Sequence, residues 1–121
     1  LIFIAGQVPF ENGKINHTGK VGKDIDIDEA KRVAKICALN IISVLKKALK
    51  GDLMRVKQCV KLGIFVSCTS DFYHQPEVAN GASDLIVKIF GEKGKHARFA
   101  VGANSLPRNV PVEVDAIFEI S

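Results

Sequence analysis

Apolar and polar residues alternate with a period of two along much of the chain, which is typical of strands with one covered face. Three stretches show this alternation: residues 56–67, 97–101 and 112–120. The opening run LIFIA, residues 1–5, is continuously apolar and predicts a buried strand that ends at Gly6. Asn12-Gly13 predicts a tight hairpin turn after that strand, because both central positions of such a turn need a positive φ.

A period of three to four residues replaces the alternation in a first long stretch. From Asp28 to about Leu49, apolar residues recur at this spacing and lysines lie off the apolar stripe, which predicts an amphipathic helix. Asp26 followed by Glu29 resembles a capping box at its start, and Gly51 indicates its end.

A second helix is expected to begin near Pro76, which suits the first turn, and to end at Gly91 and Gly94. The order is then strand, hairpin, helix, strand, helix, strand, strand, and both helices can cover one face of a mixed sheet. We therefore predict an α+β fold, a two-layer sandwich. No repeat or linker argues for a second domain, so residues 1–121 are expected to form one domain. Because the chain opens on LIFIAGQ without a Met, we expect that an N-terminal segment precedes it.

The last two strands place charged residues opposite apolar ones. Glu113 lies on the side of its strand opposite to Val112 and Val114, and Arg98 and Ala100 lie opposite to the apolar set Ala97, Phe99 and Val101. If both apolar sets point at the helices, Arg98 and Glu113 emerge together on the uncovered face. The other residues assigned to that face are too apolar to remain in water: Cys59, Gly63, Phe65 and Ile117. We expect this face to pack against copies of the chain, with Arg98 and Glu113 at the rim of a cleft between subunits.

Two interpretations of Arg98 and Glu113 follow from the residues alone. The first is a structural ion pair on a half-buried sheet, which contributes about 0–1 kcal/mol at a surface. The second is a binding site in which the guanidinium grips a substrate carboxylate and the glutamate positions or deprotonates a water molecule. The pattern favours the ion pair.

Charge and composition limit the partners. The chain of 121 residues carries a net charge of +4, and six cationic residues fall in the first helical stretch: Lys31, Arg32, Lys35, Lys46, Lys47 and Lys50. A solvated helix face explains them, and the chain has no Trp and a single Tyr for stacking on bases, so we do not expect nucleic acid as a partner. No window is apolar enough to span a membrane.

Cysteine and histidine usage predicts neither disulfides nor a metal site. The chain has three cysteines without a CxxC pair, Cys37, Cys59 and Cys68, and three scattered histidines, His17, His74 and His96. An odd number of cysteines favours a reducing, cytoplasmic setting, and Cys37 is expected to be a core residue.

Five segments, in order along nearly the whole chain, resemble the YjgF family, which includes the RidA reactive-intermediate deaminases and was formerly labelled endoribonuclease or translation inhibitor. These segments are AGQVP, FVSCTSDF, VANGASDL, HARFAVGANSLP and VPVEVDAIFEI. The resemblance implies an α+β fold like bacterial chorismate mutase, a homotrimer, and three ligand clefts between subunits. It implies no cofactor.

The resemblance also implies roles for individual residues. Arg98 matches the arginine that clamps a ligand carboxylate, and Glu113 matches the glutamate thought to position the attacking water. Gly6 matches a residue whose backbone lines the cleft, and Asn80 matches an asparagine at the start of the second helix. For Asn80, a helix-capping role remains an equal alternative. Ala100 occupies the cleft position where deaminase members usually carry a cysteine.

Other departures from the family pattern leave the activity open. Ala5 replaces a small hydroxyl residue, and the aromatic residue of the family's N-terminal segment has no counterpart in this chain. The leading hypothesis is a homotrimeric deaminase that hydrolyses small 2-imino or enamine acids to keto acids and ammonia. The alternative is a protein that binds small carboxylate metabolites without turning them over. An RNA-cleaving role is the least favoured, and a steep loss of RNA affinity with salt would support it.

Overall fold

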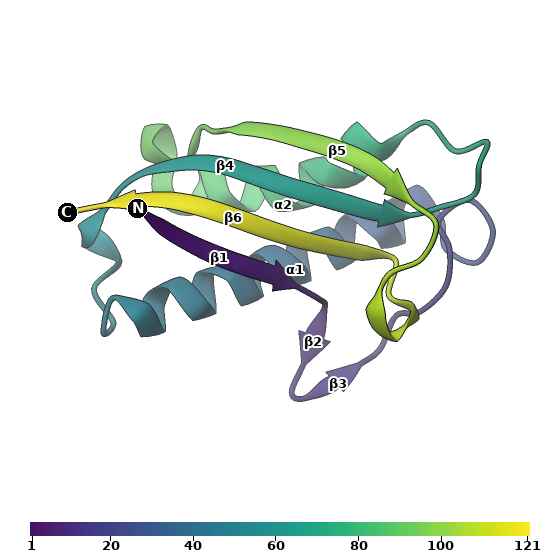
Figure 1. The fold of residues 1–121 in the computed structure, drawn as a ribbon, viewed down its shortest axis with the longest axis horizontal. Helices are drawn as coiled ribbons and strands as arrows, with labels where there is room; N and C mark the ends of the chain where they lie inside the picture. The colour runs from purple at the N-terminus through teal and green to yellow at the C-terminus, as the bar shows by residue number, and fades with distance from the viewer.

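Four strands form a mixed sheet in the computed structural model, which describes residues 1–121 (Figure 1). The strands are β1 (Ile2–Gln7), β4 (Val56–Ser67), β5 (Ala97–Ala103) and β6 (Val112–Ile120). Their order is β1-β6-β4-β5, with β4 and β5 parallel and the other two pairs antiparallel. The parallel pair needs a crossover, and α2 (Gln75–Phe90) supplies it.

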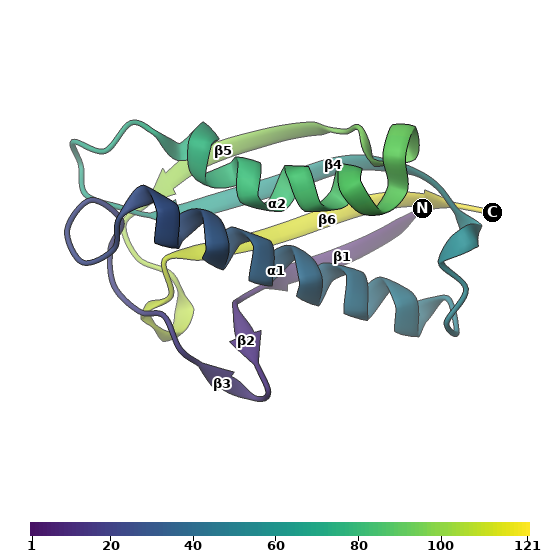
Figure 2. The same cartoon turned by 180° about the vertical axis from the view of Figure 1, so that it is seen from behind.

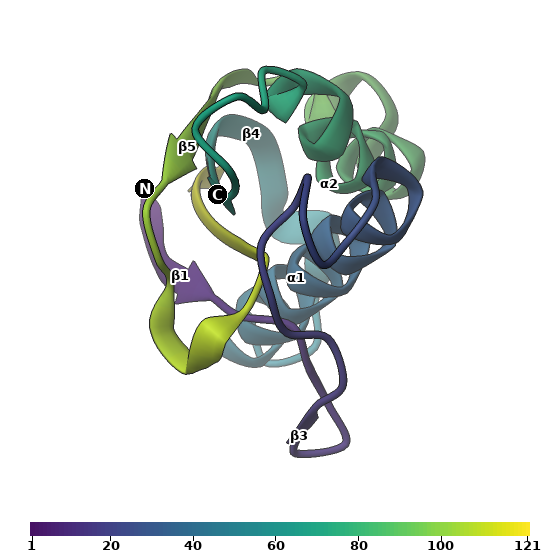
Figure 3. The same cartoon turned by 90° about the vertical axis from the view of Figure 1, so that its right-hand side faces the viewer.

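Both long helices, α1 (Ile27–Ala48) and α2, lie on the same face of the sheet (Figure 2). In the end-on view the helices form one layer and the sheet the other, and no element covers the opposite face of the sheet (Figure 3). This arrangement confirms the predicted two-layer α+β sandwich. Neither helix combines the length and apolar character needed to cross a membrane.

Only one of the two hydrogen bonds of the predicted capping box forms at the start of α1. The carboxylate of Asp26 accepts a hydrogen bond from the backbone N–H of Glu29 at 2.8 Å. The Glu29 side chain does not return to the cap and instead lies 2.9 Å from Nδ1 of His17. Half of the capping box therefore forms, because a tertiary partner takes the second carboxylate.

The predicted hairpin consists of β2 (Phe10–Glu11) and β3 (Lys14–Ile15), and it projects from the body of the molecule (Figure 3). Asn12 and Gly13 both have positive φ values, 51° and 76°, as the turn requires. The side-chain amide of Asn40 on α1 donates to the carbonyls of Val8 and Phe10 and ties the hairpin to the helix layer. Three short 3-10 turns complete the chain: η1 (Leu53–Arg55), η2 (Gly91–Gly94) and η3 (Pro107–Asn109).

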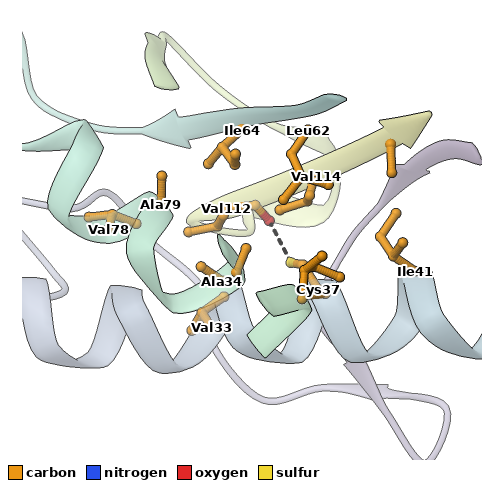
Figure 4. Packing of buried hydrophobic residues seen from close by; sticks show 14 of the residues in the cluster. Val33, Ala34, Cys37, Ile41, Leu62, Ile64, Val78, Ala79, Val112 and Val114 are labelled. Atoms are coloured by element: carbon orange, nitrogen blue, oxygen red, sulfur yellow. Dashed lines mark hydrogen bonds between the residues drawn. The ribbon is translucent and has the colours of Figure 1, made fainter. Parts of the chain in front are cut away.

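The core lies between the two layers (Figure 4). Cys37 is fully buried there, as expected, and its thiol donates to the carbonyl of Val112 at 3.4 Å. Cys59 also lies in the core, so its assignment to the uncovered face is wrong. A β-bulge explains the difference: Cys59 pairs with Phe118 and Lys61 with Ile117, so Val60 is an extra residue that shifts the alternation.

Stability should fall as pH rises above about 9, because burial raises the pKa of two thiols. The pKa of Cys59 rises from 9.0 to about 12, and that of Cys37 rises further through burial and the nearby charge of Glu113. Between these values the unfolded chain has released protons that the folded chain retains. The free energy of unfolding should therefore decrease by about 1.4 kcal/mol per pH unit for each thiol.

Urea unfolding at pH 8, 9 and 10 measures this slope. Cys59→Ala is the matched variant. It should be less stable at every pH, but its free energy of unfolding should fall less steeply with pH, because one of the two buried thiols is absent. Equal slopes in the two proteins would contradict the assignment.

Candidate functional site

Arg98 lies on β5, the edge strand, with its side chain on the face that the helices cover. Its partner in the parallel ladder is Leu62, which is fully buried in the core. The guanidinium reaches α2, where Nη1 donates to Oδ1 of Asn80 at 3.0 Å and to Oγ of Ser83 at 3.1 Å. Nη2 donates to the carbonyl of Pro76 at 3.4 Å. The first three turns of α2 therefore hold the guanidinium in place.

These bonds leave part of the guanidinium free to bind an anion. An arginine has five N–H donors, and the contacts with α2 use three of them. One donor on Nε and one on Nη2 remain, and the contacts with α2 therefore leave donors with which a guanidinium can bind a carboxylate. All three acceptors are neutral, no carboxylate of the chain pairs with Arg98, and the residue is exposed.

Glu113 lies on β6 opposite Phe65 of β4, with its side chain on the uncovered face. Its carboxylate rests on Gly6 of β1: a Cβ atom placed on Gly6 would lie 2.0 Å from Oε2. Gly6 falls within the irregular stretch between Ile4 and Gln7 where the pairing of β1 with β6 shifts. The glycine leaves the space that the carboxylate occupies, and no cation of the chain neutralises that carboxylate.

The expectation that Arg98 and Glu113 share one face is wrong. Phe99 and Val101, which were expected to point at the helices, face the open side instead, where the Phe99 ring packs edge-on against Phe65 with centroids 5.2 Å apart. The apolar residues of β5 serve the uncovered face, so the polar side of this strand turns toward α2. With β4 lying between their strands, Arg98 and Glu113 form no ion pair within one chain, and the structural ion-pair interpretation fails as well.

The other predicted site residues divide between the two faces. Asn80 lies in the second turn of α2, whose cap is His74, so the capping alternative is wrong and its amide oxygen serves Arg98. Ala100 lies beside Ile64 on the same face as Arg98 and packs against the core. Gly6 belongs with Glu113 on the open face. Within one chain, the predicted site residues therefore form two separate groups on opposite faces of the sheet.

Sequence reasoning missed two polar residues beside Arg98. Ser83 lies one helical turn after Asn80, and its Oγ is 2.9 Å from Nε2 of His96. Nδ1 of His96 lies 2.5 Å from the carbonyl of Gly94. The i, i+3 spacing of Asn80 and Ser83 is a signal that could have found the serine, because residues so spaced share a helix face.

The uncovered face is apolar and hollowed. A concavity of about 400 Å³ lies there, and its lining includes Phe3, Phe99, Lys61 and Asp115. Phe3 is 71% exposed in the isolated chain. The largest hollow of the surface lies elsewhere, at the start of α1, where acidic residues line it and would repel a carboxylate. No cluster of three or more His, Cys, Asp or Glu side chains is arranged to hold a metal ion.

Comparisons with known proteins identify the fold and the family. The family model described as "YjgF/chorismate_mutase-like, putative endoribonuclease" matches residues 1–119. Protein TCP17 of Trypanosoma cruzi is 45% identical over 121 residues, which are 99% of this chain and 75% of that protein. A RutC family protein of Pyrococcus abyssi is 31% identical over 96% of this chain and 76% of its own length. The crystal structure of Atu1372 from Agrobacterium tumefaciens, a protein of unknown function, superposes with a TM-score of 0.97 at 50% identity, over 98% of this chain and 75% of that one. The chain therefore belongs to the YjgF/chorismate mutase-like family.

Proposed function

We propose that the protein is a RidA-like deaminase that hydrolyses small 2-imino acids to keto acids and ammonia at sites shared between copies of the chain. Arg98 and Asn80 would come from one copy, and Glu113 and Gly6 from its neighbour. The observation that carries the proposal is the Arg98 guanidinium, which neutral oxygens of α2 hold while two of its donors stay free.

A carboxylate is the ligand group that best matches this arrangement. The free donors lie on Nε and Nη2, and neighbouring N–H groups of a planar guanidinium match the two oxygens of a carboxylate. A phosphate would also accept two bonds, but a single cationic group and neutral neighbours suit one negative charge better than two. A small 2-imino or 2-keto acid offers one carboxylate directly beside its reactive carbon.

The need for a second copy follows from the two faces. No motion of side chains brings Arg98 and Glu113 of one chain together, because the sheet lies between them. The uncovered face carries Phe3, Phe65, Phe99 and Val101, an apolar surface suited to packing against another copy. A homotrimer, as the family resemblance implies, would bury this face and could bring the edge strand β5 of one copy to β1 and β6 of the next.

The proposed reaction consumes only water. The water oxygen attacks the imine carbon while Glu113 accepts a proton from that water, and Glu113 then passes this proton to the nitrogen as the C=N bond becomes a single bond. In the resulting carbinolamine, the hydroxyl proton moves to the nitrogen; the C–N bond then breaks, ammonia leaves and the carbonyl of the keto acid forms. General base catalysis of this kind contributes about 10²–10⁴-fold.

A second candidate function is binding of small carboxylates without turnover. Two observations favour it: Ala5 and Ala100 bring no polar group to the site, and Ala100 packs against the core. Arg98 alone is sufficient for such binding, whereas hydrolysis also needs Glu113.

Turnover by the wild-type protein distinguishes the two functions. An amino acid oxidase that acts on alanine supplies 2-iminopropanoate, and the release of ammonia and pyruvate is followed with and without the protein. We expect release well above the spontaneous rate. Calorimetric binding of 2-oxobutanoate without such acceleration would instead support the binding function, and the absence of both would contradict the site.

A further inference from the structure

We propose that Ser83 and His96 are positioning residues that orient the Arg98 guanidinium through a directed chain of hydrogen bonds, with His96 held as its Nδ1–H tautomer. The orientation of Arg98 is a property of the fold and does not depend on the proposed function. Its consequence for carboxylate affinity does rest on that function.

The direction of the chain follows from what each end can do. A guanidinium only donates, so Oγ of Ser83 accepts from Nη1 of Arg98. A backbone carbonyl only accepts, so Nδ1 of His96 donates to Gly94. The Ser83 hydroxyl proton is then directed at Nε2 of His96, which must be the unprotonated nitrogen. The neutral imidazole with its proton on Nδ1 is the form in which every member of this chain has a partner.

Both ends of this chain of hydrogen bonds are held by rigid parts of the fold. Gly94 is buried against the end of α2, where a Cβ atom would lie 2.5 Å from the carbonyl oxygen of Ile86, so the carbonyl that holds His96 is fixed. Ser83 lies within α2 itself. His96 thus sets the rotamer of the Ser83 hydroxyl, and the hydroxyl oxygen sets one side of the guanidinium.

This arrangement fixes the orientation of the Arg98 guanidinium as well as satisfying its hydrogen-bond donors. An exposed arginine on an edge strand has a long, flexible side chain; without Ser83, the guanidinium would keep only the bond from Nη1 to Asn80 and the long bond of 3.4 Å from Nη2 to Pro76. Asn80 and Ser83 both accept from Nη1, so Ser83 adds the second short contact on this nitrogen. The plane of the group is thereby defined, and its free Nε and Nη2 donors point in a constant direction.

The first measurement is independent of any ligand. The ¹⁵N shifts of the His96 ring, recorded at a pH where the imidazole is neutral and assigned with His96→Gln, report which nitrogen carries the proton. We expect Nδ1–H. A proton on Nε2, the commoner neutral form, would overturn the proposed chain of hydrogen bonds.

The second measurement tests positioning. The ¹⁵N relaxation of Arg98 Nε, assigned with Arg98→Lys, should show an ordered side chain in the wild-type protein and in Ser83→Thr, which keeps the hydroxyl. The order should be lost in Ser83→Ala. This variant should still fold, because alanine has a high helix propensity. Equal order in Ser83→Ala and the wild-type protein would overturn the positioning role.

A third measurement separates this inference from the proposed function. Calorimetry with 2-oxobutanoate should show affinity about tenfold weaker for Ser83→Ala, little changed for Ser83→Thr, and unchanged for His74→Gln, an exposed histidine that touches only Glu77 among charged groups. If the wild-type protein binds no keto acid, the proposed function fails while the first two measurements still decide the inference. If it binds but Ser83→Ala binds as tightly, the consequence for affinity is wrong.

Discussion

Arg98→Ala and Glu113→Gln should each abolish turnover of 2-iminopropanoate, and trimers that contain both variants should recover about a third of the wild-type activity. The reason is the position of the two side chains on opposite faces of one sheet. A shared site needs an intact arginine from one copy and an intact glutamate from the next. In a trimer that contains both variants, about one site in three combines an intact arginine with an intact glutamate.

The mixture is prepared by co-expression with two different tags and purification over both, so that every oligomer analysed contains both variants. The control is a single chain that carries both substitutions, co-expressed with the wild-type chain; it tests whether mixing alone changes activity. Sedimentation should show the same oligomer in all preparations. No recovery in the Arg98→Ala and Glu113→Gln mixture, with intact oligomers, would contradict a site shared between copies.

Gly81→Ala should destabilise the protein by about 2–3 kcal/mol, against the gain of about 1 kcal/mol expected for this change in an unconstrained helix. Gly81 lies in α2 where that helix crosses α1. A Cβ atom there would lie 2.0 Å from the backbone carbonyl oxygen of Lys31, which cannot move without moving α1. The two helices must separate, and the core beneath them loosens.

Urea unfolding of the variant and the wild-type protein measures this loss. Ser43→Ala, an exposed position of α1, is the matched control, and its stability should rise by a few tenths of a kcal/mol. A Gly81→Ala protein as stable as the wild-type protein would show that the helices are not in contact at this point. Because Gly81 neighbours Asn80, relaxation of Arg98 Nε in the same variant would also reveal whether helix separation disturbs the guanidinium.

Local patterns predicted most of the elements. The capping residue Asp26, the turn at Asn12-Gly13 and Pro76 in the first turn of α2 are signals that act within a few residues. Their physical causes are an acceptor for a free N–H, a positive φ and a pre-set φ, and none of them depends on distant parts of the chain. For this reason the boundaries of α1 and α2 fall within a residue or so of the prediction.

The faces of the strands were predicted less well, for two reasons. The bulge at Val60 inserts one residue, and Cys59 therefore lies on the covered face, opposite to its prediction. On β5, the apolar side chains face the uncovered side of the sheet and not the helices. The pattern could not show this, because an edge strand beside an open apolar face can carry hydrophobic side chains on either side. The result is that Arg98 was assigned to the face of Glu113 and belongs instead with Asn80 and Ser83.

The sequence by itself determined the α+β class, the long helices and the residues that match the family, because these depend on periodicity, local capping and motif. Only the tertiary structure decided which way Arg98 points, which oxygens hold it and that Gly6 lies under the carboxylate of Glu113. Those facts depend on the register of neighbouring strands and on contacts between residues far apart in the chain. Periodicity assigns a residue to one of two sides of its strand, but only pairing with the rest of the sheet determines which side faces the helices.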